Sequence, residues 1–376
     1  DLFSPHQSII SERLRALHRL PTRSQGVVLV PVATLMQRIA PPEFLAHNVT
    51  TLKVGERLDL IATRRELEQA GYRCVAEVME HGEFAVRGSI LDLFPMGASA
   101  PYRVDLFDTD IDSIRRFDPE TQRSTDKLDD IELLPAHEFP SDETGISRFR
   151  RQYRARFEGD PMASPIYQAI SDGHIPAGIE AYLPLFFDAT ATLFDYLPEQ
   201  AVVVRYGAVD AQLESEWEQI NARFEQRRHD IERPLLSPTE LFLNPDAVRE
   251  DLNQHPVVDV IDDATRERAR TRDRAFAVRP LPDLSSRPGE AEDLSALQGF
   301  NRDFEGQVVM TAETAGRRET LRERLRASGF TVRDAESWDE ALGATAPMTL
   351  TIAPLDEGFR LPDQSLAVIP ELALFG

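Results

Sequence analysis

The residues best suited to bind another protein are Arg103, Asp105 and Phe107, which are spaced two positions apart. In the segment 102–107, YRVDLF, apolar and polar residues alternate, as in a strand with one buried face. Alternation places these three side chains together on the second face. An arginine forks onto carboxylates, an aspartate accepts from basic groups, and an exposed ring fills an apolar pocket. The alternative is a solvated sheet face, with Phe107 covered by another element of the same chain.

A small domain must position these residues. Residues 82–94 alternate in the same way, and the turn residues between 95 and 101 predict that the two strands are antiparallel neighbours. Before them, a helical pattern ends at Gly71, a good residue to follow a helix. A helix followed by a meander of short strands predicts an inserted α+β domain over residues 49–134.

The flanking segments have a different pattern. Short apolar runs bounded by turn residues predict buried parallel strands at Val27–Val30 and at Ala201–Val204. Helical patterns surround both runs, so the sequence predicts an α/β domain made of residues 1–48 and 135–272 and interrupted by the inserted domain.

The last part of the chain is predicted to form a separate unit. The segment from Arg279 to Pro288 contains three prolines, which predicts a linker over residues 273–287. Beyond it, apolar runs alternate with a helical pattern, so residues 288–376 are expected to form a small α/β domain. The whole chain is therefore expected to be a multidomain α/β protein.

Length and composition fit this view. The chain has 376 residues, more than one compact core accommodates, with 41% hydrophobic and 28% charged residues, as in ordinary soluble proteins. No apolar run approaches the roughly 18 residues of a membrane span, and no leader sequence is visible. A single cysteine, Cys74, excludes an internal disulfide and fits a reducing cytoplasm.

The charge balance bears on the partners. The formal net charge is −22, and only two of the 42 basic residues, Lys53 and Lys127, are lysines. A strongly acidic chain repels phosphate backbones and gains little from counterion release. We therefore expect little binding to duplex DNA by this segment, no membrane partner, and a protein as its partner.

Residues for enzyme chemistry are missing from the sequence. A nucleotide hydrolase needs a glycine-rich phosphate loop ending in lysine and serine or threonine, but neither lysine here follows a glycine. It also needs an acidic pair after a buried strand to hold magnesium, whereas Val204 is followed by Arg205-Tyr206-Gly207. The eight histidines show no metal-ligand spacing. We expect no catalytic residue, cofactor or metal in this segment.

Several segments together carry a resemblance to a known family. Residues 82–97 (GEFAVRGSILDLFPMG), 101–108 (PYRVDLFD) and 111–118 (IDSIRRFD) resemble the bacterial transcription-repair coupling factors (Mfd) and, in this region, their relative UvrB. The resemblance covers essentially the whole chain and is strongest from residue 1 to residue 137. It identifies the chain as the amino-terminal, UvrB-like region of that family, with the start of the first α/β domain missing before Asp1.

The resemblance implies a fold and a set of partners. The α/β domain would be a degenerate, helicase-like domain, and the inserted domain would bind UvrA. RNA polymerase and DNA would bind other domains of the full-length protein. ATP and magnesium would belong only to its carboxy-terminal translocase part. No role is implied for residues 288–376.

Four residues match the family's UvrA-binding positions. Arg87 matches the arginine after the Phe-x-Val strand, and Arg103, Asp105 and Phe107 match an Arg-x-Asp-x-Phe motif. Replacing Arg103 with alanine is expected to weaken UvrA binding and hardly change folding. Replacing Phe107 is expected to weaken binding if the ring is an anchor, or to destabilise the fold if the ring belongs to the core.

The resemblance leaves two functional hypotheses. The first is a non-catalytic region that recruits UvrA and so links stalled RNA polymerase to nucleotide excision repair. The alternative is a fragment of a UvrB-like nucleotide- or DNA-dependent repair enzyme. The absent phosphate loop, the net charge and Arg205, which stands where UvrB has an aspartate-glutamate pair, all favour the first hypothesis.

Overall fold

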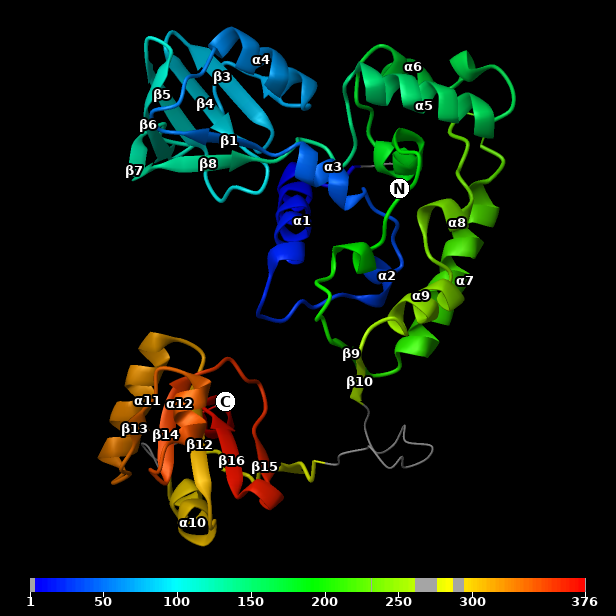
Figure 1. The fold of residues 1–376 in the computed structure, drawn as a ribbon. Coiled ribbons are helices and arrows are strands. Elements are labelled where there is room, and N and C mark those ends of the chain that lie inside the picture. Colours follow the sequence, from blue (N-terminus) through cyan, green and yellow to red (C-terminus); the bar gives the residue numbers. More distant parts are fainter. Residues whose placement is uncertain (1–3, 231, 261–275, 287–293, 376) are drawn as a thin grey trace. The chain divides into compact units, whose positions relative to one another are not determined.

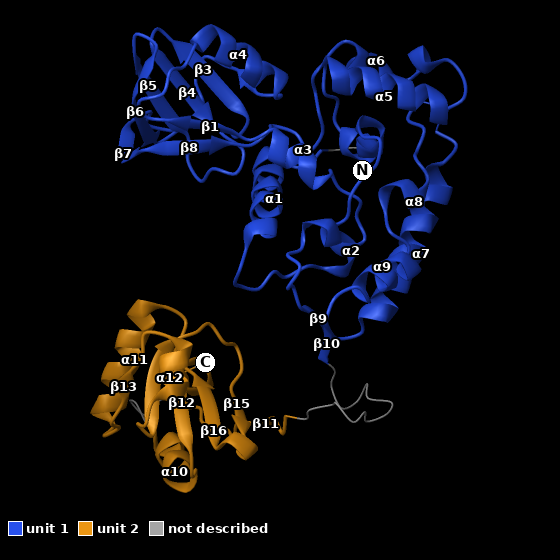
Figure 2. Ribbon diagram, in the orientation of Figure 1, with its two compact units in different colours: residues 1–266 blue, residues 267–376 orange. Residues whose placement is uncertain are grey.

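The chain forms two compact units, which are described separately. A computed structural model describes residues 4–230, 232–260, 276–286 and 294–375. Residues 1–266 form the first unit and residues 267–376 the second (Figures 1 and 2). Both units combine helices and sheets, so the expected multidomain α/β class is confirmed.

The inserted part of the first unit is built on a six-stranded sheet (Figure 1). In spatial order, its strands are β2 (Arg73–Cys74), β3 (Glu83–Arg87), β4 (Ile90–Phe94), β5 (Tyr102–Phe107), β6 (Asp110–Phe117) and β7 (Ser124–Leu128). From β3 to β7 all neighbours are antiparallel, as the alternating sequence predicted. Helix α4 (Leu60–Gln69) begins after Asp59, whose carboxylate accepts from two backbone N–H groups of its first turn.

A short ribbon joins the inserted part to the rest of the unit. Strands β1 (Thr50–Lys53) and β8 (Asp130–Leu133) pair antiparallel, with Thr50 opposite Leu133. Because these strands begin and end the insertion, the chain leaves and re-enters the body of the unit at one place.

Helix α1 (Gln7–Arg19) fixes the sheet to the body. Its apolar side, including Leu14 and Leu17, lies in the same core as Leu91 and Val104 of the sheet. The buried Ser11 hydroxyl also accepts a hydrogen bond of 2.8 Å from the backbone N–H of Gly97. The inserted sheet therefore shares one hydrophobic core with the body of the unit, which holds the two in a defined orientation.

Helices make up most of the remaining body of the first unit. They are α2 (Val32–Leu35), α3 (Pro42–His47), α5 (Glu143–Arg156), α6 (Pro165–Ser171), α7 (Val209–Arg227), α8 (Pro238–Leu241) and α9 (Pro245–Leu252), with 3-10 turns at Leu20–Thr22, Pro161–Ala163, Ile179–Phe186 and Leu193–Tyr196. A cluster of aromatic side chains, among them Phe149, Tyr153 and Phe186, packs α5 against the segment Ile179–Phe186.

The expected buried strands of this body are corrected by the structure. Val27–Val30 forms no strand, and Val27 and Leu29 are 82% and 90% exposed. The second run shifts to β9 (Val203–Tyr206), which pairs in parallel with β10 (Val257–Val260) and leaves Val204 half exposed. A run of apolar residues becomes a buried strand only where neighbouring strands and a covering layer exist, and the described residues provide β9 with one neighbouring strand.

The second unit is the expected small α/β domain. Its sheet has the order β11 (Arg279–Pro280), β15 (Phe359–Leu361), β16 (Leu366–Pro370), β12 (Gln307–Ala312), β14 (Met348–Ile352) and β13 (Arg333–Asp334). The last four run parallel, and the helices are α10 (Ser295–Asp303), α11 (Ala315–Ala327), α12 (Trp338–Gly343) and α13 (Leu372–Phe375), with a 3-10 turn at Pro362–Gln364. Apolar clusters cover both faces of the sheet.

The expected linker differs from a plain connection. Of residues 273–287, positions 273–275 and 287 lie outside the described residues. Within the described part, Arg279 and Pro280 form the edge strand β11, antiparallel to β15. An edge strand tolerates proline because its outer side needs no hydrogen-bond donor, so a proline-rich segment contributes to the sheet.

Candidate protein-binding site

The two faces of the six-stranded sheet have different surroundings. One face lies in the core that the sheet shares with α1 and α4. The other face carries all four predicted site residues, Arg87, Arg103, Asp105 and Phe107. This assignment follows from the strand registers, which place Asp105 opposite Ile90 and Ser113. We refer to this second side of the sheet as the outer face.

Arg103 and Arg87 converge on a buried carboxylate that the sequence did not single out. Asp92 on β4 lies directly opposite Arg103 on β5, and its side chain is fully buried. Arg103 donates to both carboxylate oxygens, from Nε to Oδ1 at 2.7 Å and from Nη2 to Oδ2 at 3.0 Å. Arg87 donates to the same Oδ2 atom. The outer face thus contains an Arg–Asp–Arg cluster in which two cations share one buried anion.

Arg103 makes further contacts with its own domain besides those with Asp92. Its Nη1 atom donates to the backbone carbonyl of Gln122 at 3.2 Å, and its guanidinium lies 4.9 Å above the ring of Phe117. The hydrogen bonds to Asp92 raise the pKa of Arg103 above its ordinary value, so the group stays charged. Its side chain is 18% exposed, whereas that of Arg87 is 49% exposed. Arg87 therefore presents much more of its charge to a partner than Arg103 does.

Asp105 and Phe107 lie further along β5. The carboxylate of Asp105 accepts a hydrogen bond of 3.0 Å from the hydroxyl of Ser113. Phe107 is 79% exposed, so the possibility that it belongs to the core is excluded. A register shift between Asp105 and Leu106 lies just before it, and such irregularities re-aim the side chains near them. An exposed ring beside charged groups has the composition of a binding anchor.

Sequence reasoning missed Asp92, although the residues around it indicate that its charge must be paired. Asp92 is the single charged residue in the otherwise apolar strand β4, Ile90–Phe94. A charge in such a position is expected to be paired, because an isolated buried carboxylate is costly. Its partner, however, depends on the register between β4 and β5, which the sequence pattern alone does not define.

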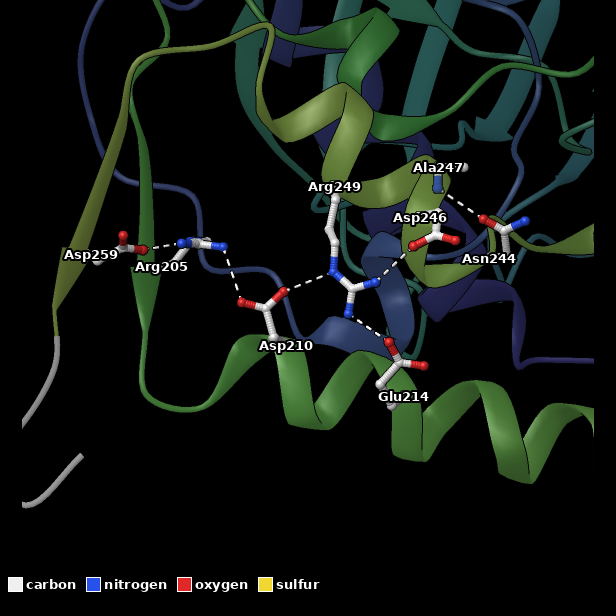
Figure 3. A network of polar contacts seen from close by, with 8 residues as sticks. All are labelled: Arg205, Asp210, Glu214, Asn244, Asp246, Ala247, Arg249 and Asp259. Atoms are coloured by element: carbon white, nitrogen blue, oxygen red, sulfur yellow. Dashed lines mark hydrogen bonds and ion pairs between the residues drawn. The ribbon is translucent and has the colours of Figure 1, made fainter. Parts of the chain in front are cut away.

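Arginines pair with carboxylates around the end of β9, where the sequence has Arg205 in place of an acidic pair for magnesium (Figure 3). Arg205 on β9 donates through Nε to Asp259 on β10, and its Nη1 atom lies 3.3 Å from Oδ2 of Asp210 on α7. These contacts raise the pKa of Arg205, with the hydrogen bond to Asp259 as the main cause. The guanidinium of Arg205 thus lies between the carboxylates of Asp210 and Asp259 at the end of β9.

A second arginine extends the network to α9 (Figure 3). Arg249 donates to Asp210 at 3.0 Å, to Glu214 at 2.6 Å and to Asp246 at 2.9 Å. Every one of these carboxylates is therefore satisfied by a guanidinium of the same chain. In the part of the chain that the structure describes, no group of three or more His, Cys, Asp or Glu side chains is arranged to hold a metal ion. No helix in the same residues is long and apolar enough to cross a membrane.

Two family models match the chain. The model described as the UvrB interaction domain matches residues 50–139, which include the whole six-stranded sheet and its outer face. The model described as the MFD D3 domain matches residues 300–374, which make up most of the second unit.

Individual relatives match over a larger part. The transcription-repair-coupling factor of Haemophilus influenzae is 45% identical, and that of Escherichia coli 42%, in both cases over 100% of this chain. The alignments cover 33% and 32% of those proteins, so the chain spans about a third of their length. The corresponding protein of Staphylococcus aureus is 37% identical over 150 residues, which is 40% of this chain and 13% of that protein.

Proposed function

We propose that this chain is a non-catalytic region that recruits UvrA through its inserted domain. The premise is that the whole chain matches the amino-terminal region of the transcription-repair-coupling factors. In the complete protein, this recruitment links a stalled RNA polymerase to nucleotide excision repair, and RNA polymerase and DNA bind through other domains. The observation that carries the proposal is that the exposed Phe107 and the half-exposed Arg87 share the outer face of the matched interaction domain.

The geometry supports a division of work among the four predicted residues. Phe107 fills an apolar pocket of UvrA, Arg87 pairs with a carboxylate, and Asp105 accepts from a basic group. The sequence suggested that Arg103 binds a carboxylate of the partner. In the structure its N–H groups donate to Asp92 and to the backbone carbonyl of Gln122 instead. In this proposal Arg103 is a positioning residue that holds Asp92, and through it Arg87, in place.

The proposal predicts that purified UvrA binds the 376-residue chain and that the complex depends on the outer face. Replacing Arg87 with alanine is expected to weaken the complex by about 1–2 kcal/mol, because a half-exposed charge contributes less than a buried anchor. The dissociation constant is measured by titration calorimetry. Replacing Arg64, an exposed arginine of α4, serves as the control and should leave the affinity unchanged. Absence of binding by the unaltered chain would refute the recruitment role.

The network around Arg205 leads to a second prediction, that the chain neither binds nor hydrolyses ATP with magnesium. Arg205 and Arg249 neutralise the carboxylates at the end of β9, and the sequence has no phosphate loop. Calorimetric titration with magnesium-ATP is expected to give no heat of binding, with a phosphate-loop ATPase as the positive control. A micromolar affinity for this chain would contradict the prediction and favour the UvrB-like enzyme.

A further inference from the structure

A row of cations continues the outer face beyond the predicted site. In the strand registers, Arg103 on β5 stands opposite Arg115 on β6, and Arg115 stands opposite Lys127 on β7. Directly opposed residues of antiparallel strands point to the same side of a sheet. Arg115 and Lys127 therefore lie on the outer face together with Arg103, and Arg103 is joined to Arg87 through Asp92. We call Arg103, Arg115 and Lys127 the basic row.

Such a row is unfavourable within the isolated domain. Like charges that stand directly opposite on neighbouring strands repel each other. Arg103 is compensated by Asp92, but neither Arg115 nor Lys127 has an ion pair among the residues described by the structure. The Nε atom of Arg115 is, in addition, buried without a hydrogen-bond partner. Two adjacent cations thus remain without an anion, and polar groups of this kind usually have a partner.

The sign of this charge is opposite to that of the chain. The formal net charge is −22, yet the cross-strand line that runs from Ala85 through Asp92 to the basic row has three cations and one carboxylate. That carboxylate is Asp92, which two arginines share. The other carboxylates on this side of strands β3 to β7 lie outside the line and have their own contacts, Glu83 with Arg73, Asp105 with Ser113 and Asp110 with Arg57. A local excess of positive charge complements an acidic surface, and complementary charge fixes the orientation of a partner and speeds association.

We propose that the UvrA-binding surface extends across β6 and β7, where Arg115 and Lys127 receive an acidic segment of UvrA. This inference rests on the proposed function and adds two contact residues and the chemical character of the matching UvrA surface. Nucleic acid fits less well, because the strongly negative chain repels a phosphate backbone and the row shares its face of the sheet with an exposed aromatic ring, Phe107.

The test is reversal of both charges. The double variant Arg115→Glu/Lys127→Glu is compared with Lys53→Glu/Arg65→Glu, which makes the same change in net charge outside the outer face. Lys53 lies on the ribbon strand β1, and Arg65 lies exposed on α4, which covers the opposite face of the sheet. UvrA affinity is measured at several salt concentrations, and the melting temperature reports on folding.

We expect the Arg115→Glu/Lys127→Glu variant to bind UvrA at least about tenfold more weakly at low salt, with a flatter salt dependence than the unaltered chain. The control variant should stay within about twofold, because its charges lie outside the interface. If the reversed variant does not fold, the neutral variant Arg115→Gln/Lys127→Gln replaces it and should also bind more weakly.

The outcomes separate this inference from the proposed function. If the unaltered chain does not bind UvrA, the recruitment role and the inference both fail. If the unaltered chain binds and Phe107→Ala weakens the complex, but the row variant behaves like the control, only the extension across β6 and β7 is overturned. Binding of duplex DNA that depends on Arg115 and Lys127, with UvrA affinity unchanged, would instead assign the row to nucleic acid and overturn the inference.

Discussion

Replacing Phe107 with alanine is expected to weaken UvrA binding by about 2–4 kcal/mol, the range of a central aromatic anchor. The ring is 79% exposed in the isolated chain, so it gains nearly all of its burial from the partner. For the same reason, the substitution should change the stability of the chain by less than about 0.5 kcal/mol. The measurements are the dissociation constant by calorimetry and the melting temperature of the same preparation.

A matched control is available on the opposite side of the sheet. Ile61 on α4 is also a large apolar side chain and is 69% exposed. Ile61→Ala should leave both UvrA binding and stability unchanged, because α4 covers the face of the sheet away from the proposed site. Full UvrA affinity in the folded Phe107→Ala variant would remove the ring from the interface. A large loss of stability in that variant would contradict the exposed position itself.

The fold of the inserted domain was predictable because one side of its sheet is buried. The alternating pattern of residues 102–107 has its apolar positions in the core shared with α1 and α4, and a one-residue slip would expose them all. The body of the first unit was less predictable. At Val27–Val30 and in β9, an apolar run looks the same whether or not strands and helices cover it, so the sequence indicated burial that the structure does not have.

The sequence predicted which side of the sheet the residues of the proposed site share, but not the contacts that they make. Alternation placed Arg103, Asp105 and Phe107 correctly on one side of β5. The pairing of Arg103 with Asp92 and the alignment of Arg115 with Lys127 depend on registers that turns and irregularities define. The apolar–polar pattern of a single strand shows which residues share a face. It does not show which residue of the neighbouring strand lies opposite, because that depends on the turns and bulges between the strands.

The structure changes the expected result for Arg103 in particular. The sequence alone predicts that Arg103→Ala weakens UvrA binding and hardly affects folding. Because Asp92 is fully buried, loss of Arg103 leaves its carboxylate with Arg87 as its remaining cation. We now expect the variant to lose about 2–4 kcal/mol of stability, since a buried charge that loses one partner is strongly destabilising. Hydrogen exchange of the β4 and β5 amides measures this loss locally.

The double variant Asp92→Ala/Arg103→Ala tests whether the buried charge is the cause. Removing both partners leaves no uncompensated anion, so the double variant should be no less stable than Arg103→Ala alone, and the two substitutions should be clearly non-additive. Both variants should bind UvrA more weakly even where they are fully folded, because Arg87 loses the carboxylate that orients it. If Arg103→Ala keeps the stability of the unaltered chain within about 0.5 kcal/mol while losing UvrA affinity, Arg103 contacts the partner directly and is not a positioning residue.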